Sequence, residues 1–196
     1  MLIGFPGGHS LDGFYAGLGP LVSKEQRAHL LFFPVDERVG ASDKESNGKA
    51  LRKALCDCGL ANPEQVLAPL CEGMADSCLK AYGRLLRTLA PEGADLLILG
   101  VGEDGHVASL FPNKKEIAER GDDWLLVSDA PKPPPKRITL PPSAILKAKE
   151  VWLVFRGQEK KEAWRKFNDA RSDAKDCPAK LVLKRKGPTV VWADLE

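Results

Sequence analysis

The sequence predicts an α/β fold: a three-layer, Rossmann-like arrangement in which a mostly parallel, twisted sheet has helices on both faces. Short apolar runs alternate along the chain with segments of helical periodicity, as expected of successive strand and helix units. These runs are continuously apolar, which is typical of strands buried on both faces. A length of 196 residues is ordinary for one domain, so we expect a single domain over residues 1–196.

Six short segments have the composition of buried strands. They are rich in leucine, valine, isoleucine and phenylalanine, and helical segments separate most of them. We expect these segments to build the sheet. The predicted strands cover residues 2–5, 29–35, 95–101, 124–127, 151–155 and 189–192.

The clearest helix lies before the third of these strands. Apolar residues recur at three- and four-residue spacing from Leu79 to Leu89, which marks an amphipathic helix. Asp76 or Ser77 is expected to cap its start, and Pro91 to follow its end. Further helices are predicted over residues 47–55 and 158–170, and an apolar pattern from Leu11 to Leu18 indicates another.

Charge and hydropathy exclude several classes of protein. The chain has 29 basic and 27 acidic side chains, a balance that gives no support to a nucleic-acid or membrane partner. No apolar run approaches the ~20 residues of a membrane-spanning helix. The N-terminus lacks the basic and apolar regions of a secretory signal. We therefore expect a cytoplasmic protein that acts on a small molecule. We also expect a monomer or weak homodimer.

Three polar segments follow predicted strands, and we expect them to share one rim of the sheet. They are GFPGGHS (residues 4–10), PVDERVG (residues 34–40) and GVGEDGH (residues 100–106). In open α/β sheets, ligands bind beyond the carboxyl ends of the strands, where such segments meet. The rim is therefore the predicted ligand site.

The first segment has the residue types of a phosphate-binding turn. Gly7 and Gly8 allow a close approach of the backbone, and His9 and Ser10 precede a predicted helix whose free N–H groups attract anions. The alternative is a plain tight turn. The pattern is neither the G-x-G-x-x-G fingerprint nor a P-loop, which disfavours dinucleotides and ATP.

The second segment supplies Asp36 and Arg38 as candidate substrate-binding residues. An arginine at this rim can hold an anionic or carbonyl oxygen through its fork of donors. The alternative is a solvated cluster of charges with no role in binding.

The third segment supplies the candidate general base, His106. Histidine can accept a proton near neutral pH, and Asp104 is close enough in sequence to orient one ring nitrogen. The alternative is a loop histidine that caps a helix end. No G-x-S-x-G motif or reactive-cysteine context supports a covalent intermediate, and no metal site is expected. The residues alone therefore predict water activated by His106, acting on a small phosphorylated substrate.

Two longer motifs identify a family. GVGEDGHVASLFP (residues 100–112) and KPPPKRITLPPSAIL (residues 132–146) resemble the 6-phosphogluconolactonase family, which is related to the glucosamine-6-phosphate deaminases. DERVG with the later Ser46 and Asn47, VWLVFRGQEKKEAW, and the closing CPAKLVL and VVWADLE support this resemblance. It extends from about Gly4 to Asp194.

The resemblance implies hydrolysis of 6-phosphogluconolactone, a phosphosugar lactone, to 6-phosphogluconate in the pentose phosphate pathway. His106 matches the family's general base, and Arg38 matches an arginine that stabilises the developing oxyanion. Arg137 and Lys160 match positions that line the phosphate end of the site. No metal or organic cofactor is implied, because an ester carbonyl is already electrophilic.

Two other functions stay open. The related deaminases share the D-G-H element, but they follow it with Asn-Glu-Pro and carry Asp-Glu-Tyr where this chain has Asp36 to Arg38. A catalytically weak sugar-phosphate-binding protein is the other alternative. The first loop departs from the family's Ser-Gly-Gly-Ser-Thr-Pro, Arg156 stands where threonine is usual, and the family's N-terminal helix is expected to be missing.

Overall fold

A five-stranded parallel sheet forms the centre of the computed structural model, which describes residues 1–7, 11, 13–40, 42, 45–69 and 75–196. The strand order is β2-β1-β4-β7-β8, and each neighbouring pair runs parallel. These strands are β1 (Leu2–Phe5), β2 (Leu31–Pro34), β4 (Leu96–Gly100), β7 (Glu150–Arg156) and β8 (Thr189–Asp194). The predicted α/β fold with a mostly parallel sheet is confirmed.

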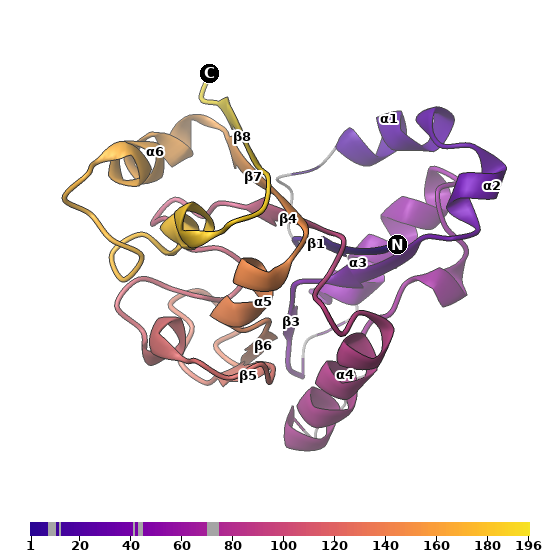
Figure 1. Ribbon diagram of the computed structural model, residues 1–196, viewed down its shortest axis with the longest axis horizontal. Coiled ribbons are helices and arrows are strands. Elements are labelled where there is room, and N and C mark those ends of the chain that lie inside the picture. The colour runs from indigo at the N-terminus through magenta and orange to yellow at the C-terminus, as the bar shows by residue number, and fades with distance from the viewer. Residues whose placement is uncertain (8–10, 12, 41, 43–44, 70–74) are drawn as a thin grey trace.

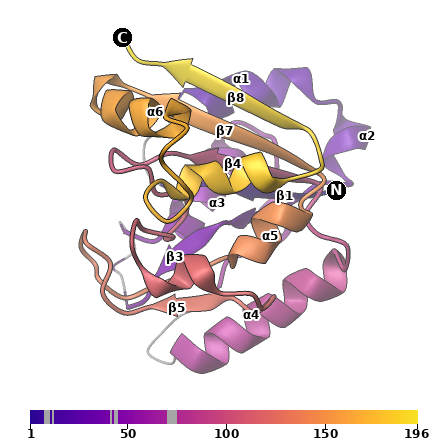
Figure 2. The ribbon, with the colours of Figure 1, turned by 60° about the vertical axis from the view of Figure 1, so that its left-hand side comes forward.

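Helices cover both faces of this sheet, as Figures 1 and 2 show. On one face, Ile3 and Ile98 pack in a core with Leu51 and Leu55 of α3. On the other face, a larger core joins the sheet to α4, α5 and α6. The helices are α1 (Phe14–Leu21), α2 (Lys24–Arg27), α3 (Asn47–Asp57), α4 (Ala75–Leu89), α5 (Pro142–Lys147) and α6 (Lys161–Asn168).

The start of α4 differs from the prediction. The helix begins at Ala75, so Asp76 and Ser77 lie in its first turn and neither is the cap. An acidic residue in the first turn still interacts favourably with the positive end of the helix dipole, which explains why Asp76 marks this end of the helix without being its cap. The helix ends at Leu89, two residues before Pro91, as expected.

The predicted strand at residues 124–127 belongs to a second sheet, not to the central one. It is β5 (Leu125–Val127), which pairs antiparallel with β6 (Arg137–Thr139). β6 in turn pairs antiparallel with β3 (Asp36–Arg38). Each of these strands has three residues, too few to show a periodicity, and β6 follows a proline-rich stretch that reads as a loop. This small sheet brings Asp36 and Arg38 next to Arg137.

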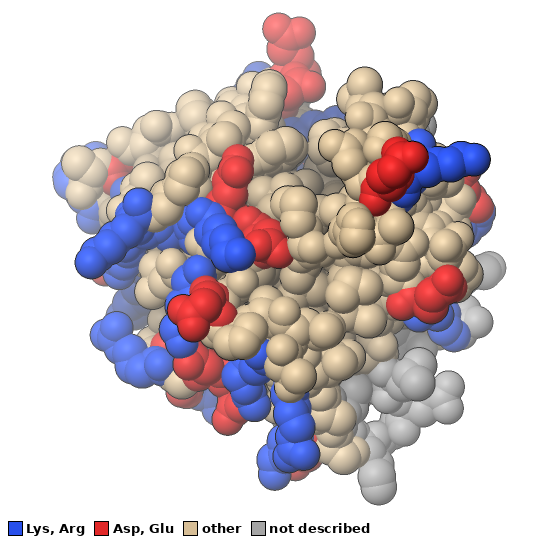
Figure 3. All heavy atoms as spheres, turned by 45° about the vertical axis from the view of Figure 1, so that its right-hand side comes forward, with Lys and Arg blue, Asp and Glu red and all other residues tan. Residues whose placement is uncertain are grey.

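Acidic and basic side chains are interspersed over the face shown in Figure 3. This pattern agrees with the small net charge of +2. No helix within the described residues is long and apolar enough to cross a membrane.

Candidate active site

A polar cavity lies beyond the carboxyl ends of the strands, and it contains most of the predicted site residues. Gly7, Asp36, Arg38, His106, Arg137 and Lys160 all line it. Gly8, His9 and Ser10 lie outside the described residues. Residues that the sequence analysis did not select also line the cavity: Pro6, Asn47, Gly100, Val101, Gly102, Ala108, Phe111, Lys132 and Pro133.

His106 and Asp104 form a hydrogen-bonded pair at this cavity. The His106 Nδ1 atom lies 2.6 Å from Oδ1 of Asp104, and the backbone N–H of His106 donates to the same oxygen at 3.1 Å. An ionised carboxylate can only accept, so Nδ1 carries the hydrogen when the ring is neutral. The other ring nitrogen, Nε2, is then an acceptor, which is the state that a general base requires.

Asp104 stays ionised throughout the physiological pH range. Its burial by itself raises the pKa of the carboxyl group, but hydrogen bonds and the charge of His106 outweigh that effect and lower the pKa to about 2. A permanent negative charge therefore lies against Nδ1 of His106. Such a charge stabilises the imidazolium that forms when Nε2 takes a proton.

Glycines shape the turn that carries this pair. The N–H of Gly102 donates to the carbonyl of His106 at 2.8 Å, and the N–H of Gly105 donates to the carbonyl of Gly102 at 3.0 Å. Gly105 has a φ of +94°, a conformation that favours glycine. A Cβ atom on Gly102 would lie 2.1 Å from Nδ1 of His106. The imidazole therefore occupies the space that any other residue at position 102 would need.

Aromatic packing holds the other side of the imidazole. The rings of His106 and Phe111 have centroids 4.6 Å apart, and Phe111 is fully buried. The guanidinium of Arg137 lies 5.6 Å from the Phe111 centroid. Phe111 thus packs near both the imidazole and the guanidinium.

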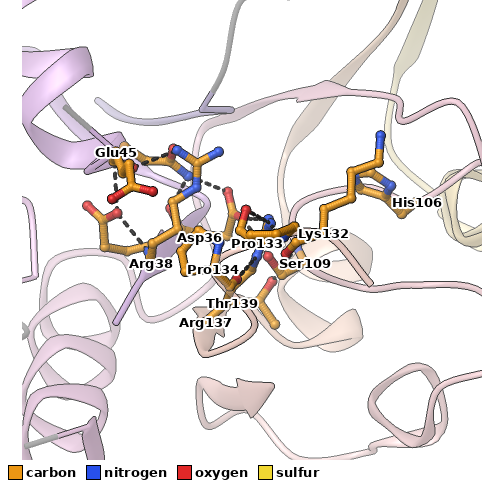
Figure 4. A network of polar contacts seen from close by, with 12 residues as sticks. Asp36, Arg38, Glu45, His106, Ser109, Lys132, Pro133, Pro134, Arg137 and Thr139 are labelled. Atoms are coloured by element: carbon orange, nitrogen blue, oxygen red, sulfur yellow. Dashed lines mark hydrogen bonds and ion pairs between the residues drawn. The ribbon is translucent and has the colours of Figure 1, made fainter. Parts of the chain in front are cut away.

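Asp36 is the centre of a buried network, which Figure 4 shows in part. Its Oδ2 atom accepts a hydrogen bond from Ser109 Oγ at 2.6 Å and lies 3.9 Å from Arg137 Nη1. Its Oδ1 atom accepts from Asn47 Nδ2 at 3.0 Å. The predicted substrate-binding carboxylate lines the cavity, but both its oxygens already accept from or face protein donors. Its described contacts join three distant segments of the chain.

Glu37, which the sequence analysis left without a role, fixes the start of α3. The carboxylate is buried and accepts from the backbone N–H groups of Arg38, Asn47 and Gly48 at 2.7 to 2.8 Å. The Ser46 hydroxyl donates to it at 2.9 Å. Four hydrogen bonds satisfy this buried charge and tie β3 to the helix. The backbone of Arg38 is held in place by the same bonds.

The Arg38 side chain lies at the cavity wall. Its Nη1 atom donates to the Glu45 carbonyl at 2.6 Å, and within the described residues its Nε atom has no hydrogen-bond partner. The guanidinium is thus anchored at one end and retains donors for a ligand.

Arg137 makes more contacts with protein than the predicted phosphate role suggests. The side chain is 7% exposed, and its Nε atom donates to the Pro134 carbonyl at 3.1 Å. Its Nη2 atom donates to the Lys132 carbonyl at 2.9 Å. Burial lowers the pKa of Arg137, and the nearby Asp36 carboxylate counteracts this effect. The guanidinium therefore holds the loop between β5 and β6 (Figure 4).

Lys160 and Arg156 lie in different places. Lys160 lines the polar cavity, with its Nζ atom 3.4 Å from Oε1 of Glu159. Arg156 lines a separate apolar hollow together with Trp152 and Trp192. Arg156 is not among the residues that line the polar cavity. It is on the face of β7 that carries Trp152, because residues two and four positions apart along a strand share a face.

The sequence alone does not reveal which residues far apart in the chain contact one another at the cavity. Asn47 and Ser109 were noticed only as parts of family motifs, yet both donate to Asp36. Lys132 begins the KPPPKRITLPPSAIL motif, which by itself gives it no role, yet it lines the cavity. Asn47 is the first residue of α3 and follows the Ser46 cap, which marks a helix start but gives no sign of a contact with Asp36.

Fold and cavity together define an α/β protein with a ligand site beyond the ends of parallel strands. The sequence profile of the family described as glucosamine-6-phosphate isomerases/6-phosphogluconolactonase matches residues 1–192, and the chain belongs to this family. A 6-phosphogluconolactonase of Mycobacterium leprae is 36% identical over 173 residues, which cover 83% of this chain and 70% of that protein.

Solved structures share the fold. A 6-phosphogluconolactonase of Trypanosoma brucei superimposes with a TM-score of 0.75 at 27% identity, covering 98% of this chain and 83% of the other. A monomeric glucosamine-6-phosphate deaminase superimposes with a TM-score of 0.80 at 20% identity, covering 99% of this chain and 86% of the other. Because both kinds of enzyme have this fold, the fold alone does not decide between the two reactions.

Proposed function

We propose that this chain is a 6-phosphogluconolactonase, a single lactonase-like domain over residues 1–196 that hydrolyses 6-phospho-D-glucono-1,5-lactone to 6-phosphogluconate. The observation that carries the proposal is the 2.6 Å contact between His106 Nδ1 and Asp104. It leaves Nε2 as a proton acceptor in a cavity that arginine and lysine side chains also line. The named relatives described above support the choice of substrate.

The proposed reaction begins with a water molecule between His106 and the lactone carbonyl. Nε2 takes a proton from the water as its oxygen bonds to the carbonyl carbon, and the carbonyl oxygen becomes an oxyanion. Arg38 stabilises this oxyanion through guanidinium donors that the Glu45 carbonyl does not occupy. Asp104 stabilises the imidazolium.

The ring opens in the second step. The oxyanion re-forms the carbonyl, the bond between that carbon and the ring oxygen breaks, and the imidazolium returns its proton to the leaving ring oxygen. His106 thus ends the cycle neutral and the product is the open-chain acid. No step requires a redox group or a metal, because the ester carbonyl is already electrophilic.

Lys160 and Arg137 are proposed to hold the phosphate end of the substrate. Lys160 supplies a compact charge at the cavity wall. Arg137 contributes positive charge from beneath the wall, since its Nε and Nη2 atoms already donate to the backbone. The absence of a side chain at Gly7 lets the Asn47 side chain lie against the backbone there. A Cβ atom there would lie 2.1 Å from Asn47 Oδ1.

The deaminase reaction is disfavoured by the residues after His106. The segment from Ala108 to Phe111 contains no acid where the deaminases carry a glutamate. The Ser109 hydroxyl in this segment donates to Asp36. Moving a proton between sugar carbons needs a second acid–base group, which this segment does not supply.

A coupled assay tests the proposal. Freshly generated 6-phosphogluconolactone is hydrolysed with and without the protein, and an excess of a 6-phosphogluconate-oxidising enzyme reports the product. We expect a rate proportional to protein concentration after the spontaneous rate is subtracted. Rates equal to the spontaneous one would contradict the proposal. Ammonia release from glucosamine 6-phosphate at the same protein concentration would favour the deaminase reaction instead.

A further inference from the structure

Lys132 lies at the cavity wall, and the reaction described above gives it no role. Its side chain is 52% exposed and forms an ion pair with Oε1 of Glu103, whose own side chain is 48% exposed. Glu103 directly precedes Asp104 on the turn that carries His106. Figure 4 shows the Lys132 side chain extending from its loop to the side of the cavity where His106 lies.

The backbone beneath Lys132 is held firmly, although the side chain is exposed. Arg137 donates to the carbonyls of Lys132 and Pro134, and the N–H of Ala130 donates to the Pro135 carbonyl at 3.0 Å. Prolines at positions 133, 134 and 135 restrict the same stretch. The loop therefore gives Lys132 a fixed base, from which its flexible four-carbon stem reaches over the cavity.

Lys132 and Lys160 share one end of the cavity. Both line it, and the charges of both act on Glu103: its hydrogen bond and ion pair with Lys132 lower the pKa of this carboxyl group most, and Lys160 lowers it further. Each ammonium group has one half-exposed carboxylate as its partner, Glu103 for Lys132 and Glu159 for Lys160, and a bound phosphate would replace these partners. A phosphate dianion carries more charge than Glu103.

The ion pair between Lys132 and Glu103 can easily be replaced by a contact of Lys132 with another anion. Ion pairs between half-exposed side chains are weak, because water solvates both partners and holding two long side chains costs entropy. By contrast, a phosphate bound against the cavity wall is partly shielded from water, and its contacts with ammonium groups are stronger.

We propose that Lys132 is a further substrate-binding residue, whose ammonium group leaves Glu103 and binds the phosphate of the bound lactone. Besides its charge at the phosphate end, Arg137 then has a second role as a positioning residue, because it holds the loop from which Lys132 extends. This inference rests on the proposed lactonase function, and it deepens that function by assigning selectivity for the phosphorylated substrate. Lys132, which stands outside the proposed proton transfers, affects binding and leaves the chemical step unchanged.

Lys132→Met tests the inference by removing the charge and keeping the apolar stem. We expect KM for the phosphorylated lactone to rise about tenfold, the size of one charge-assisted contact, with kcat within about twofold of the wild type. Hydrolysis of D-glucono-1,5-lactone, which has no phosphate, is expected to stay unchanged. Lys114→Met is the matched control, because Lys114 forms a similar ion pair with Asp129 and does not line the cavity.

Glu103→Gln provides the complementary test. It removes the competing carboxylate, so we expect KM for the phosphorylated lactone to fall about twofold. In a protein that already carries Lys132→Met, the same change is expected to lower KM by less, because the competition for the Lys132 ammonium group is absent. A loss that is equal for both lactones, or absent for both, in Lys132→Met overturns the inference.

A binding measurement separates this inference from the proposed reaction. Calorimetric titration with 6-phosphogluconate measures affinity whether or not the protein hydrolyses the lactone. If the wild type is inactive but Lys132→Met still weakens binding about tenfold, the reaction fails and Lys132 stands as an anion-binding residue. If the wild type is active and both proteins bind equally, the reaction stands and the inference fails.

Discussion

Asp104 provides a graded test of how the His106 pair works. Asp104→Asn keeps an oxygen that can accept from Nδ1 and from the His106 backbone N–H, but it removes the negative charge. Asp104→Ala removes the charge and the acceptor together. In the structure one carboxylate oxygen accepts both hydrogen bonds, at 2.6 and 3.1 Å. The two variants therefore separate the electrostatic part of the contact from its orienting part.

The magnitude follows from the lowered pKa of Asp104. The fall from 3.8 to about 2 corresponds to about 2.4 kcal/mol in favour of the charged form. Because 34% of the side chain is exposed and the backbone bond survives in Asn, about 1 kcal/mol is expected to act on the imidazolium. We therefore expect kcat to fall about fivefold in Asp104→Asn. Asp104→Ala is expected to lose about 100-fold, because the ring also loses its orientation.

The coupled lactonase assay measures both variants, with circular dichroism and thermal unfolding to check the fold. Asp129→Asn is the matched control, since Asp129 pairs with Lys114 away from the cavity and its charge is not expected to affect kcat. The reasoning is refuted if Asp104→Ala, correctly folded, keeps kcat within about twofold of the wild type.

Three further predictions concern the turn, the pH dependence and the loop. Gly102→Ala places a Cβ 2.1 Å from His106 Nδ1, so we expect a loss of kcat of about tenfold or more with an unchanged circular dichroism spectrum; unchanged kcat contradicts this. The Asp104 carboxylate stabilises the fold above its unfolded pKa of 3.8, and this contribution is lost as the pH falls towards 2. The difference in unfolding free energy between wild type and Asp104→Asn is therefore expected to be about 1 kcal/mol at neutral pH and to shrink in acid, as urea titrations can measure; a difference that grows in acid contradicts it. Arg137→Lys loses the guanidinium hydrogen bonds to the carbonyls of Lys132, Pro133 and Pro134, and it is expected to destabilise the fold by about 2 kcal/mol in the same titration; an unchanged midpoint would contradict this.

The sequence predicts those parts of the fold that leave a pattern in neighbouring residues, such as the strands of the central sheet. Five of the six predicted strands pair in the central sheet, because four or more consecutive apolar residues are a strong local pattern. The sixth pairs in the small sheet, with strands of three residues that have no pattern of their own. Their pairing depends on contacts between segments far apart in the chain. Residue periodicity carries no information about such contacts.

The candidate site also combines local contacts, which the sequence predicts, with long-range contacts, which it does not. Asp104 and His106 are two residues apart, so their contact is readable from the D-G-H element. Ser109 and Asp36 are 73 residues apart, and their hydrogen bond is visible only in the folded chain. Arg137 was expected to contact phosphate directly, whereas most of its described bonds go to the protein backbone. The cytoplasmic location and the monomer or weak homodimer stay predictions.

His106→Asn tests the central claim most directly. Asparagine keeps polarity and approximate size but cannot act as the base, so the account predicts that kcat for the phosphorylated lactone falls about 10²–10⁴-fold towards the spontaneous rate. Affinity for 6-phosphogluconate is predicted to stay within about twofold, because the proposed phosphate contacts come from other residues. Near-wild-type kcat in correctly folded His106→Asn, after subtraction of the spontaneous rate, would show that the histidine is structural and would contradict the mechanism.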